Sequence, residues 1–231
     1  MRTSCLLEIA VASVERVRAA ERAGAHRLEL CANLEVGGLT PKVELIRGVR
    51  STVKLPIHVL VRPRAGNFVY SRDEFARMKE QITALHGENV QGIVTGVLRP
   101  DGSVDTQRTR ELVALASPMQ VTFHRAFDET KDLPAALEAI VRTGAHRVLT
   151  SGGAADAQCG APVLRSLIQQ AGDRIIILPG GGLHPGNLAE VAHATGASEL
   201  HTGLGGVIPY SSKDVAAFES AVRECVVSLR R

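Results

Sequence analysis

The sequence predicts an α/β fold, a single-domain (β/α)8 TIM barrel that takes up residues 1–231. Short runs rich in Val, Ile and Leu recur along the chain, and amphipathic segments of helical length separate them. Glycines stand directly before several of these runs, where a helix would end and the chain would turn back. The 231 residues are also close to the roughly 250 that such a barrel typically needs. Together these observations favour one closed barrel without a linker.

Eight apolar runs form the expected strands, which span residues 6–9, 27–30, 57–61, 92–95, 120–123, 147–150, 175–178 and 199–201. Capping signals mark the expected beginnings of four helices: Ser13, Thr40 before Pro41, the capping box Ser71–Glu74, and Asp132 ahead of Pro134. The expected helix ends are Gly24, Gly87, Gly144, Gly172 and Gly196. Each strand therefore leads into a helix, and a short loop returns the chain to the next strand.

A repeated motif before the even-numbered strands favours a closed barrel over an open sheet. The chain reads Gly24-Ala25-His26-Arg27 at the second strand, Gly144-Ala145-His146-Arg147 at the sixth, and Gly196-Ala197-Ser198-Glu199 at the eighth. The alternative, a doubly wound open sheet, usually carries a glycine-rich turn after its first strand. Here that segment, residues 9–13, contains no glycine. Equivalent units at several strands are more typical of the barrel.

Composition excludes several classes of protein. The net charge is only +3, the Lys and Arg residues are spread along the chain, and there are two Tyr, five Phe and no Trp, so we expect no nucleic-acid partner. No stretch approaches 18 apolar residues and the first residues lack a signal-peptide pattern, so we expect no membrane contact and a cytoplasmic location. The four cysteines show no paired spacing, which predicts free thiols.

Side-chain alternation sorts the strand residues into two faces. In a barrel one face packs against the helices and the other points inward. On this rule the polar side chains Glu8, Glu29, His124 and His201 point into the barrel. Active sites of this fold lie at the carboxyl ends of the strands. The candidate site there consists of Glu8, Glu29, Cys31, Arg62, His124 and His201, with the loop residues Arg64, Arg125 and Asp128.

These residue types suit proton transfer and anion binding. Carboxylates and imidazoles in a dry pocket perform general acid–base catalysis, for which the candidates are Glu8, Glu29, His124, Asp128 and His201. Guanidinium groups and the N–H groups of glycine-rich turns bind phosphate or carboxylate, for which the candidates are Arg62, Arg64, Arg125, Ser151, Gly152, Gly181 and Gly182. Alternatively, Arg62 and Arg125 neutralise Glu8 and Glu29 in structural ion pairs, and the glycines serve only tight turns.

Several ordered motifs make the chain similar to a known family. They are Arg27–Cys31, Gly37–Pro41, Arg62–Arg64, Thr122–Asp128, Leu149–Gly152 and Gly180–Gly182. On these motifs the chain resembles the CutC family from Leu6 to about Gly203. The resemblance implies a TIM barrel, a cytoplasmic location, homo-oligomers and a part in copper homeostasis through Cu(I) binding. Many relatives carry Cys where Ala10 stands, so Cys31 is the one thiol at the mouth that would serve as the metal ligand.

Three functions remain open on the sequence. The first is a protein that binds or passes on Cu(I), with copper as its cofactor. The second is an enzyme that acts by general acid–base chemistry on a small anionic metabolite bearing phosphate or carboxylate; no lysine at a strand end suggests a Schiff base, and no dinucleotide fingerprint is present. The third is a barrel with a structural role, whose copies contact one another through the helix expected at residues 214–229.

Overall fold

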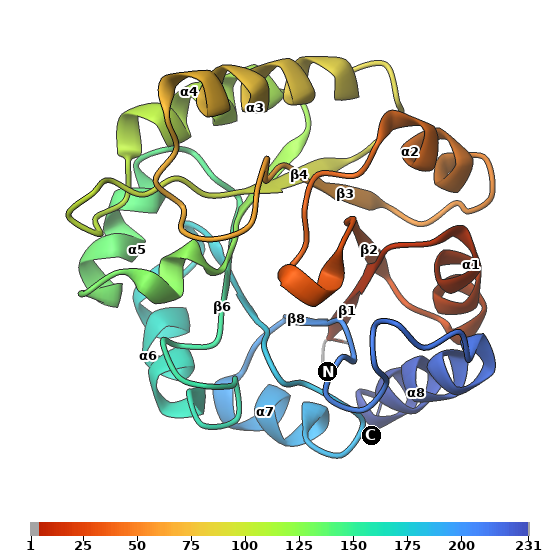
Figure 1. The fold of residues 1–231 in the computed structure, drawn as a ribbon. Helices are drawn as coiled ribbons and strands as arrows, with labels where there is room; N and C mark the ends of the chain where they lie inside the picture. Colours follow the sequence, from red (N-terminus) through yellow and green to blue (C-terminus); the bar gives the residue numbers. More distant parts are fainter. Residues whose placement is uncertain (1–4, 231) are drawn as a thin grey trace.

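Eight parallel strands form the wall of a barrel, and eight helices cover its outside (Figure 1). The computed structural model describes residues 5–230. Its strands are β1 Leu6–Val11, β2 Arg27–Leu30, β3 Ile57–Leu60, β4 Gly92–Thr95, β5 Gln120–Phe123, β6 Arg147–Thr150, β7 Ile176–Pro179 and β8 Glu199–Thr202. The strands pair in the order β7-β6-β5-β4-β3-β2-β1-β8, and a bridge between Gly180 and His201 joins the two ends. The predicted barrel is therefore confirmed.

The helices follow the strands in strict alternation. They are α1 Val14–Ala23, α2 Val43–Arg50, α3 Arg72–Leu85, α4 Thr106–Ala116, α5 Leu133–Val141, α6 Ala161–Ala171, α7 Leu188–Thr195 and α8 Val215–Ser228. Two short 3-10 helices, Leu34–Val36 and Arg125–Glu129, lie in loops at the carboxyl ends of β2 and β5. None of the helices in the described part of the chain has the length and apolar character needed to cross a bilayer.

The capping signals were correct at three of the four expected helix starts. Ser13, Ser71 and Asp132 each accept a hydrogen bond from the first turn of their helix, and Ser71 forms the full capping box with Glu74. The expected start at Thr40 is wrong, because α2 begins three residues later, at Val43. The Thr40 hydroxyl instead accepts a hydrogen bond from the backbone of Arg62, which ties this loop to the end of β3.

Glycine ends fewer helices than expected. Gly24 and Gly196 are left-handed C-caps of α1 and α7, as predicted. Gly172 is the C-cap of α6, also with a positive φ. Gly87 is not a cap, because α3 ends at Leu85 and its C-cap is His86, in a right-handed conformation. The loops that return to the strands are nevertheless short, so consecutive strands and helices stay adjacent around the barrel.

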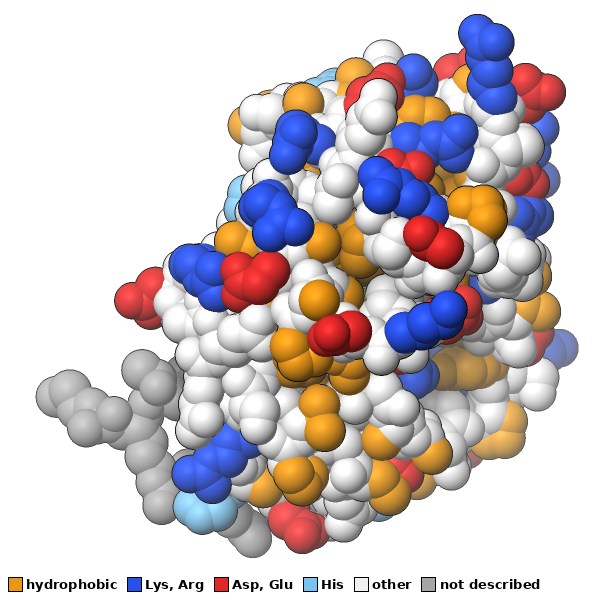
Figure 2. Space-filling view, turned by 90° about the vertical axis from the view of Figure 1, so that its left-hand side faces the viewer, with side chains coloured by type: hydrophobic (Ala, Val, Ile, Leu, Met, Phe, Trp, Pro, Cys, Tyr) orange, Lys and Arg blue, Asp and Glu red, His pale blue; other side chains and the backbone are white. Residues whose placement is uncertain are grey.

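Apolar side chains pack between the strands and the helices, as alternation predicts. Phe123 and Leu7 on the strands are fully buried, and so is Phe218 on α8. The last helix, expected to be exposed, packs against α1 through this apolar side and exposes only its other face. On the side of the molecule shown in Figure 2, basic and acidic side chains are interspersed, so that face presents no broad patch of one charge.

An ion-pair network fills the amino-terminal half of the barrel. The guanidinium of Arg27 donates to Glu199 (2.6 Å) and to Glu8, and Arg147 also donates to Glu199 (2.8 Å) and to Gln120 (2.6 Å). Arg27, Glu8 and Glu199 are all buried, so each charge is compensated inside the barrel.

The interior also contains a glycine that makes room for a ring. A Cβ at Gly92 would lie 2.6 Å from His58 Cδ2 and Nε2. We expect Gly92→Ala to lower the free energy of unfolding by about 1–3 kcal/mol, because overpacking forces the ring aside. Urea denaturation measures this loss. The same substitution in a His58→Ala background should cost little, since the ring is absent.

Gly48→Ala is the matched control for this prediction, because its Cβ would meet only Val14 Cγ2, at 3.8 Å. Gly48 lies inside α2, where alanine is the better helix former, so a small gain of up to about 1 kcal/mol is expected. An equal cost of Gly92→Ala with and without the His58 ring would contradict the steric explanation.

Candidate functional site

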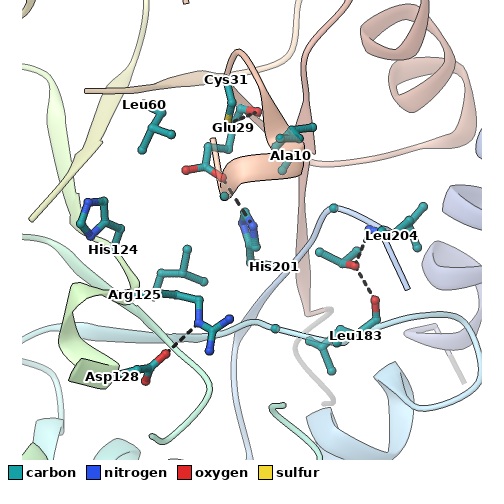
Figure 3. A pocket seen from close by; sticks show the side chains of 18 of the residues that line it. Ala10, Glu29, Cys31, Leu60, His124, Arg125, Asp128, Leu183, His201 and Leu204 are labelled. Atoms are coloured by element: carbon teal, nitrogen blue, oxygen red, sulfur yellow. Dashed lines mark hydrogen bonds and ion pairs between the residues drawn. The ribbon is translucent and has the colours of Figure 1, made fainter. Parts of the chain in front are cut away.

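A cavity of about 520 Å³ opens at the carboxyl ends of the strands (Figure 3). Nine of the predicted site residues line it: Glu29, Cys31, Arg62, His124, Arg125, Asp128, Gly181, Gly182 and His201. Four do not line it: Glu8, Arg64, Ser151 and Gly152. The sequence reasoning missed the apolar and aromatic part of the lining, which includes Leu60, Phe68, Leu149, Leu204 and Tyr210. Alternation places Leu60 and Leu149 inward, but the loop residues among them carry no such signal.

A chain of hydrogen-bonded charges connects the barrel interior to this cavity. His201 Nδ1 donates to Glu8 Oε1 at 2.7 Å, and His201 Nε2 lies 3.5 Å from Glu29 Oε2. The other oxygen of Glu8 accepts from Arg27 Nε. Glu8 therefore holds His201 in place from below, and His201 presents its second nitrogen to Glu29. The alternative pairing of Glu8 and Glu29 with Arg62 and Arg125 is wrong, because Arg27 and His201 contact Glu8 and His201 faces Glu29.

The three groups of this chain have shifted pKa values. Burial would raise the pKa of Glu8, but Arg27 and His201 outweigh it and hold that pKa far below its usual range. Burial would also lower the pKa of His201, but the hydrogen bond with Glu8 and the charge of Glu29 raise it. Burial raises the pKa of Glu29 to about 7, with His201 opposing this shift and Glu8 adding to it. Glu29 is thus able to gain or lose a proton near neutral pH.

His124 enters the cavity as a neutral hydrogen-bond donor. Its Nδ1 accepts from the backbone N–H of Ala126 at 3.2 Å, so the ring proton resides on Nε2. Burial lowers the pKa of His124 to about 3, and the positive charge of Arg62 adds to the effect. Nε2 is buried and has no hydrogen-bond partner among the described residues. A buried donor without a partner is costly, so His124 Nε2–H is a candidate for contact with a ligand atom.

Two of the predicted anion-binding arginines have structural roles instead. Arg62 lines the cavity, but it donates to the carbonyl groups of Val36, Gly38 and Gly66 and stacks over Phe68. Arg64 pairs with Glu74 (2.5 Å) and lies outside the cavity. Both side chains therefore hold loops at the rim, because nearby oxygens already use most of their N–H groups.

The glycine turn after β6 is filled by the protein itself. The carboxylate of Asp128 accepts from the backbone N–H groups of Ser151 and Gly153, at 3.1 Å each, and from the Thr150 hydroxyl. The N–H of Gly152 donates to Thr150 Oγ1. The anion site expected at Ser151 and Gly152 is therefore occupied by an internal carboxylate, and Asp128 is a structural anion more than a proton carrier.

The turn after β7 keeps its donors. No described residue accepts a hydrogen bond from the backbone N–H of Gly181 or Gly182, and both glycines line the cavity. Arg125 lies beside them: Nε donates to Asp128 and Nη2 to Ser151, while a Cβ at Gly181 would lie 3.2 Å from Nη1. Arg125 Nη1 and these two N–H groups thus form a set of donors open to an anion.

The donors around Cys31 do not fit Cu(I), which prefers thiolates and thioethers. Cys31 is fully buried, and burial together with the charges of Glu29 and Glu8 raises the pKa of its thiol well above the usual value. Position 10 holds alanine, and the other three cysteines lie outside the cavity. Within residues 5–230, no cluster of three or more His, Cys, Asp or Glu side chains is arranged to hold a metal ion.

Comparison with known proteins decides the family. The model of the CutC family matches residues 5–206. The chain belongs to the CutC family. A CutC family protein of Mesorhizobium japonicum is 47% identical over 196 residues, which cover 85% of this chain and 76% of that protein. The copper homeostasis protein cutC homolog of Homo sapiens is 43% identical, over 85% of this chain and 72% of that protein.

Solved structures agree with this assignment. The crystal structure of CutC from Streptococcus agalactiae is 28% identical and aligns with a TM-score of 0.82, covering 86% of this chain and 98% of that chain. More distant solved barrels align with TM-scores from 0.63 to 0.67 at identities from 12 to 17%. Those distant likenesses show the fold alone. The CutC resemblance expected from the motifs is thus confirmed.

The raised pKa of Glu29 predicts a stability effect in this CutC-family protein. An acid whose pKa is higher in the folded state than its ordinary 4.5 weakens folding as the pH rises from about 4.5 to 7. Glu29→Gln removes this loss, so the variant should gain up to about 3 kcal/mol over the original protein between pH 5 and 8. Urea denaturation at both pH values measures the difference.

Glu138→Gln is the control, because the pKa of Glu138 is shifted in the opposite direction. Arg174 lowers the pKa of Glu138 to about 2, so its contribution is present at neutral pH and is lost only in acid. The variant should therefore be no more stable than the original protein at pH 8. If Glu29→Gln has the same free energy of unfolding as the original protein at both pH values, the raised pKa of Glu29 is contradicted.

Proposed function

We propose that this CutC-family protein binds a small anionic metabolite in the mouth of its barrel and exchanges a proton with it at Glu29. The observation that carries the proposal is the Glu8–His201–Glu29 chain, which ends at the cavity with a carboxyl group whose pKa is raised to about 7. A general acid or base works best when its pKa lies near the operating pH, and such a group typically contributes about 10²- to 10⁴-fold in rate.

The charge of the ligand is argued from the donors that remain open. Arg125 Nη1 and the N–H groups of Gly181 and Gly182 meet at one wall of the cavity, next to the ends of β5 and β7. In this fold phosphate groups are frequently bound by the loops after the seventh and eighth strands. The loop after β8 contributes Gly203, Gly205 and Gly206 to the same cavity. A phosphate or carboxylate at this wall would leave the rest of the ligand near Glu29 and His201.

An anion-binding measurement tests this proposal with 2-phosphoglycolate as the probe. Arg125→Gln should weaken binding about 10-fold or more, because hydrogen bonds to charged groups contribute about 1.5–3 kcal/mol. Isothermal titration calorimetry gives the affinity. Arg174→Gln removes the same charge from the outer surface, where Arg174 pairs with Glu138, and should leave the affinity unchanged. Absence of binding to the original protein, or equal binding by both variants, would refute the proposal.

Cu(I) binding is the second candidate, favoured by the name of the human relative and by the position of Cys31 in the cavity lining. The single protonated thiol and the neighbouring carboxyl groups of Glu29 and Glu8 speak against a tight site. This candidate requires Cys31 to lose its proton, for which the nearby carboxylates are unfavourable neighbours.

Competition against a chromogenic Cu(I) chelator tests the copper candidate. If Cu(I) binds at Cys31, the original protein should bind one equivalent of Cu(I) and Cys31→Ser should bind none. Cys159→Ser should still bind one equivalent, since Cys159 is exposed and lies outside the cavity. Equal binding by the original protein and Cys31→Ser would rule out this site. Both variants retain side chains of similar size, so folding should not obscure the comparison.

We further propose that the protein acts in the cytoplasm and forms homo-oligomers. Support for the first point comes from four cysteines without disulfides in the described part of the chain, as expected in a reducing compartment. The exposed outer face of α8 is the surface that we propose for contacts between copies. The partners proposed are thus a small anion or a metal ion and a second copy of the chain, with no nucleic acid or membrane.

A further inference from the structure

We infer that the barrel mouth catalyses enolisation: Glu29 removes a proton from the carbon next to a carbonyl group while His124 donates a hydrogen bond to the carbonyl oxygen. The ligand class is a small carbonyl compound that also bears a phosphate or carboxylate. This inference rests on the proposed function, since it needs the anion to be held by Arg125 and the glycine turn. Beyond the proposed function, it specifies that the transferred proton comes from a carbon atom, and it gives His124 a role.

The fixed position of His124 is the first argument. Its ring packs directly on the backbone of the segment after β4, because a Cβ at Gly96 would lie 2.6 Å from Nδ1. The Phe68 ring lies on it with a centroid distance of 4.7 Å, and Ala126 N–H holds Nδ1. Three neighbours thus set the ring so that Nε2–H is the one donor left over. His124 is 5% exposed, so this donor has almost no water to satisfy it.

The chemistry of that donor is the second argument. A guanidinium usually binds a carboxylate or phosphate that is already charged in the substrate, and Arg125 is available for that purpose. A neutral imidazole N–H suits an oxygen that is uncharged in the substrate and gains negative charge during the reaction. The pKa of His124, lowered to about 3, keeps the ring neutral across the physiological range. A carbonyl oxygen that becomes an enolate oxygen fits this description.

The arrangement of the base is the third argument. Glu29 and His201 lie on one side of the cavity, and His124 and Arg125 lie on the other (Figure 3). Leu60 and Leu149, both buried, add apolar surface to the cavity lining. A ligand between the two sides would place its carbonyl oxygen at His124 and its neighbouring carbon toward Glu29. The apolar surface strengthens both contacts, since water is excluded.

The proposed step balances in protons and electrons. Glu29 takes the proton as the C–H bond breaks, and that electron pair forms the C=C bond of the enolate. The pair of the C=O π bond moves to the oxygen, where His124 Nε2–H stabilises it. Return of the proton from Glu29 to the same or the adjoining carbon regenerates the base. His201, held by Glu8, is a positioning residue that orients Glu29 and influences its protonation.

Hydrogen–deuterium exchange tests the inference. In D₂O the protein should exchange the carbon-bound protons next to the carbonyl of dihydroxyacetone phosphate or 2-oxobutanoate, as followed by proton NMR. Glu29→Gln should reduce the exchange rate about 100-fold or more. His124→Ala should lose a similar factor, whereas His124→Gln, which keeps an N–H donor, should recover part of it. Arg174→Gln should exchange at the original rate, and circular dichroism checks the fold of each variant.

A binding comparison separates failure of this inference from failure of the proposed function. The probe is 2-phosphoglycolohydroxamate, which resembles an enediolate, measured beside 2-phosphoglycolate. The original protein should bind the hydroxamate at least about 10-fold more tightly, and His124→Ala should lose this preference while still binding 2-phosphoglycolate. If 2-phosphoglycolate binds but neither exchange nor the preference is seen, enolisation is refuted and anion binding stands. If 2-phosphoglycolate does not bind, the proposed function fails as well.

Discussion

The barrel interior depends on the buried carboxylate of Glu8. A charge without exposed surface is tolerated only when partners replace the water that it loses, and Glu8 has Arg27 on one oxygen and His201 on the other. Removing one partner of such a pair typically costs about 3–5 kcal/mol. Through Glu8 the ion pairs at the amino-terminal end of the barrel are connected to the cavity at the other end. The same contact that stabilises the fold therefore orients the acid–base pair His201 and Glu29.

Many hydrogen-bond donors around the cavity already bind acceptors within the protein, and this determines which polar groups remain for a ligand. The Nη1 and Nη2 groups of Arg62 donate to loop carbonyls, and the carboxylate of Asp128 occupies the turn after β6. The groups left without a partner among the described residues include Arg125 Nη1, the N–H groups of Gly181 and Gly182, and His124 Nε2. A cavity with few open donors selects its ligand by geometry, since each unmatched polar atom is penalised. These are donors for oxygen atoms, which supports our proposal that the ligand is an anionic metabolite and not Cu(I).

Membership of the CutC family and the chemistry of this cavity lead to different expectations. The family includes relatives named for copper homeostasis, yet the only thiol in the lining is buried, protonated and next to two carboxyl groups. Position 10 lies in the same buried cluster as Cys31 and holds alanine, so no second sulfur is supplied there. The acid–base pair of His201 and Glu29, in contrast, is held by two further buried side chains. Glu8 contacts His201, and Arg27 contacts Glu8. The buried ion pairs thus fit the proton transfer that we propose better than they fit a soft metal.

The sequence by itself determined the strands, nearly all to within two residues of their ends, and the inward direction of Glu29, His124 and His201, because alternation is a local property of the chain. It also contained the signal for Arg27, which shares the inward face with Glu29. Only the tertiary structure decided that Glu8 pairs with Arg27, that Asp128 fills the turn after β6, and that His124 keeps a free Nε2–H. Such pairings join residues from different strands, and which donor meets which acceptor depends on the register and closure of the whole barrel.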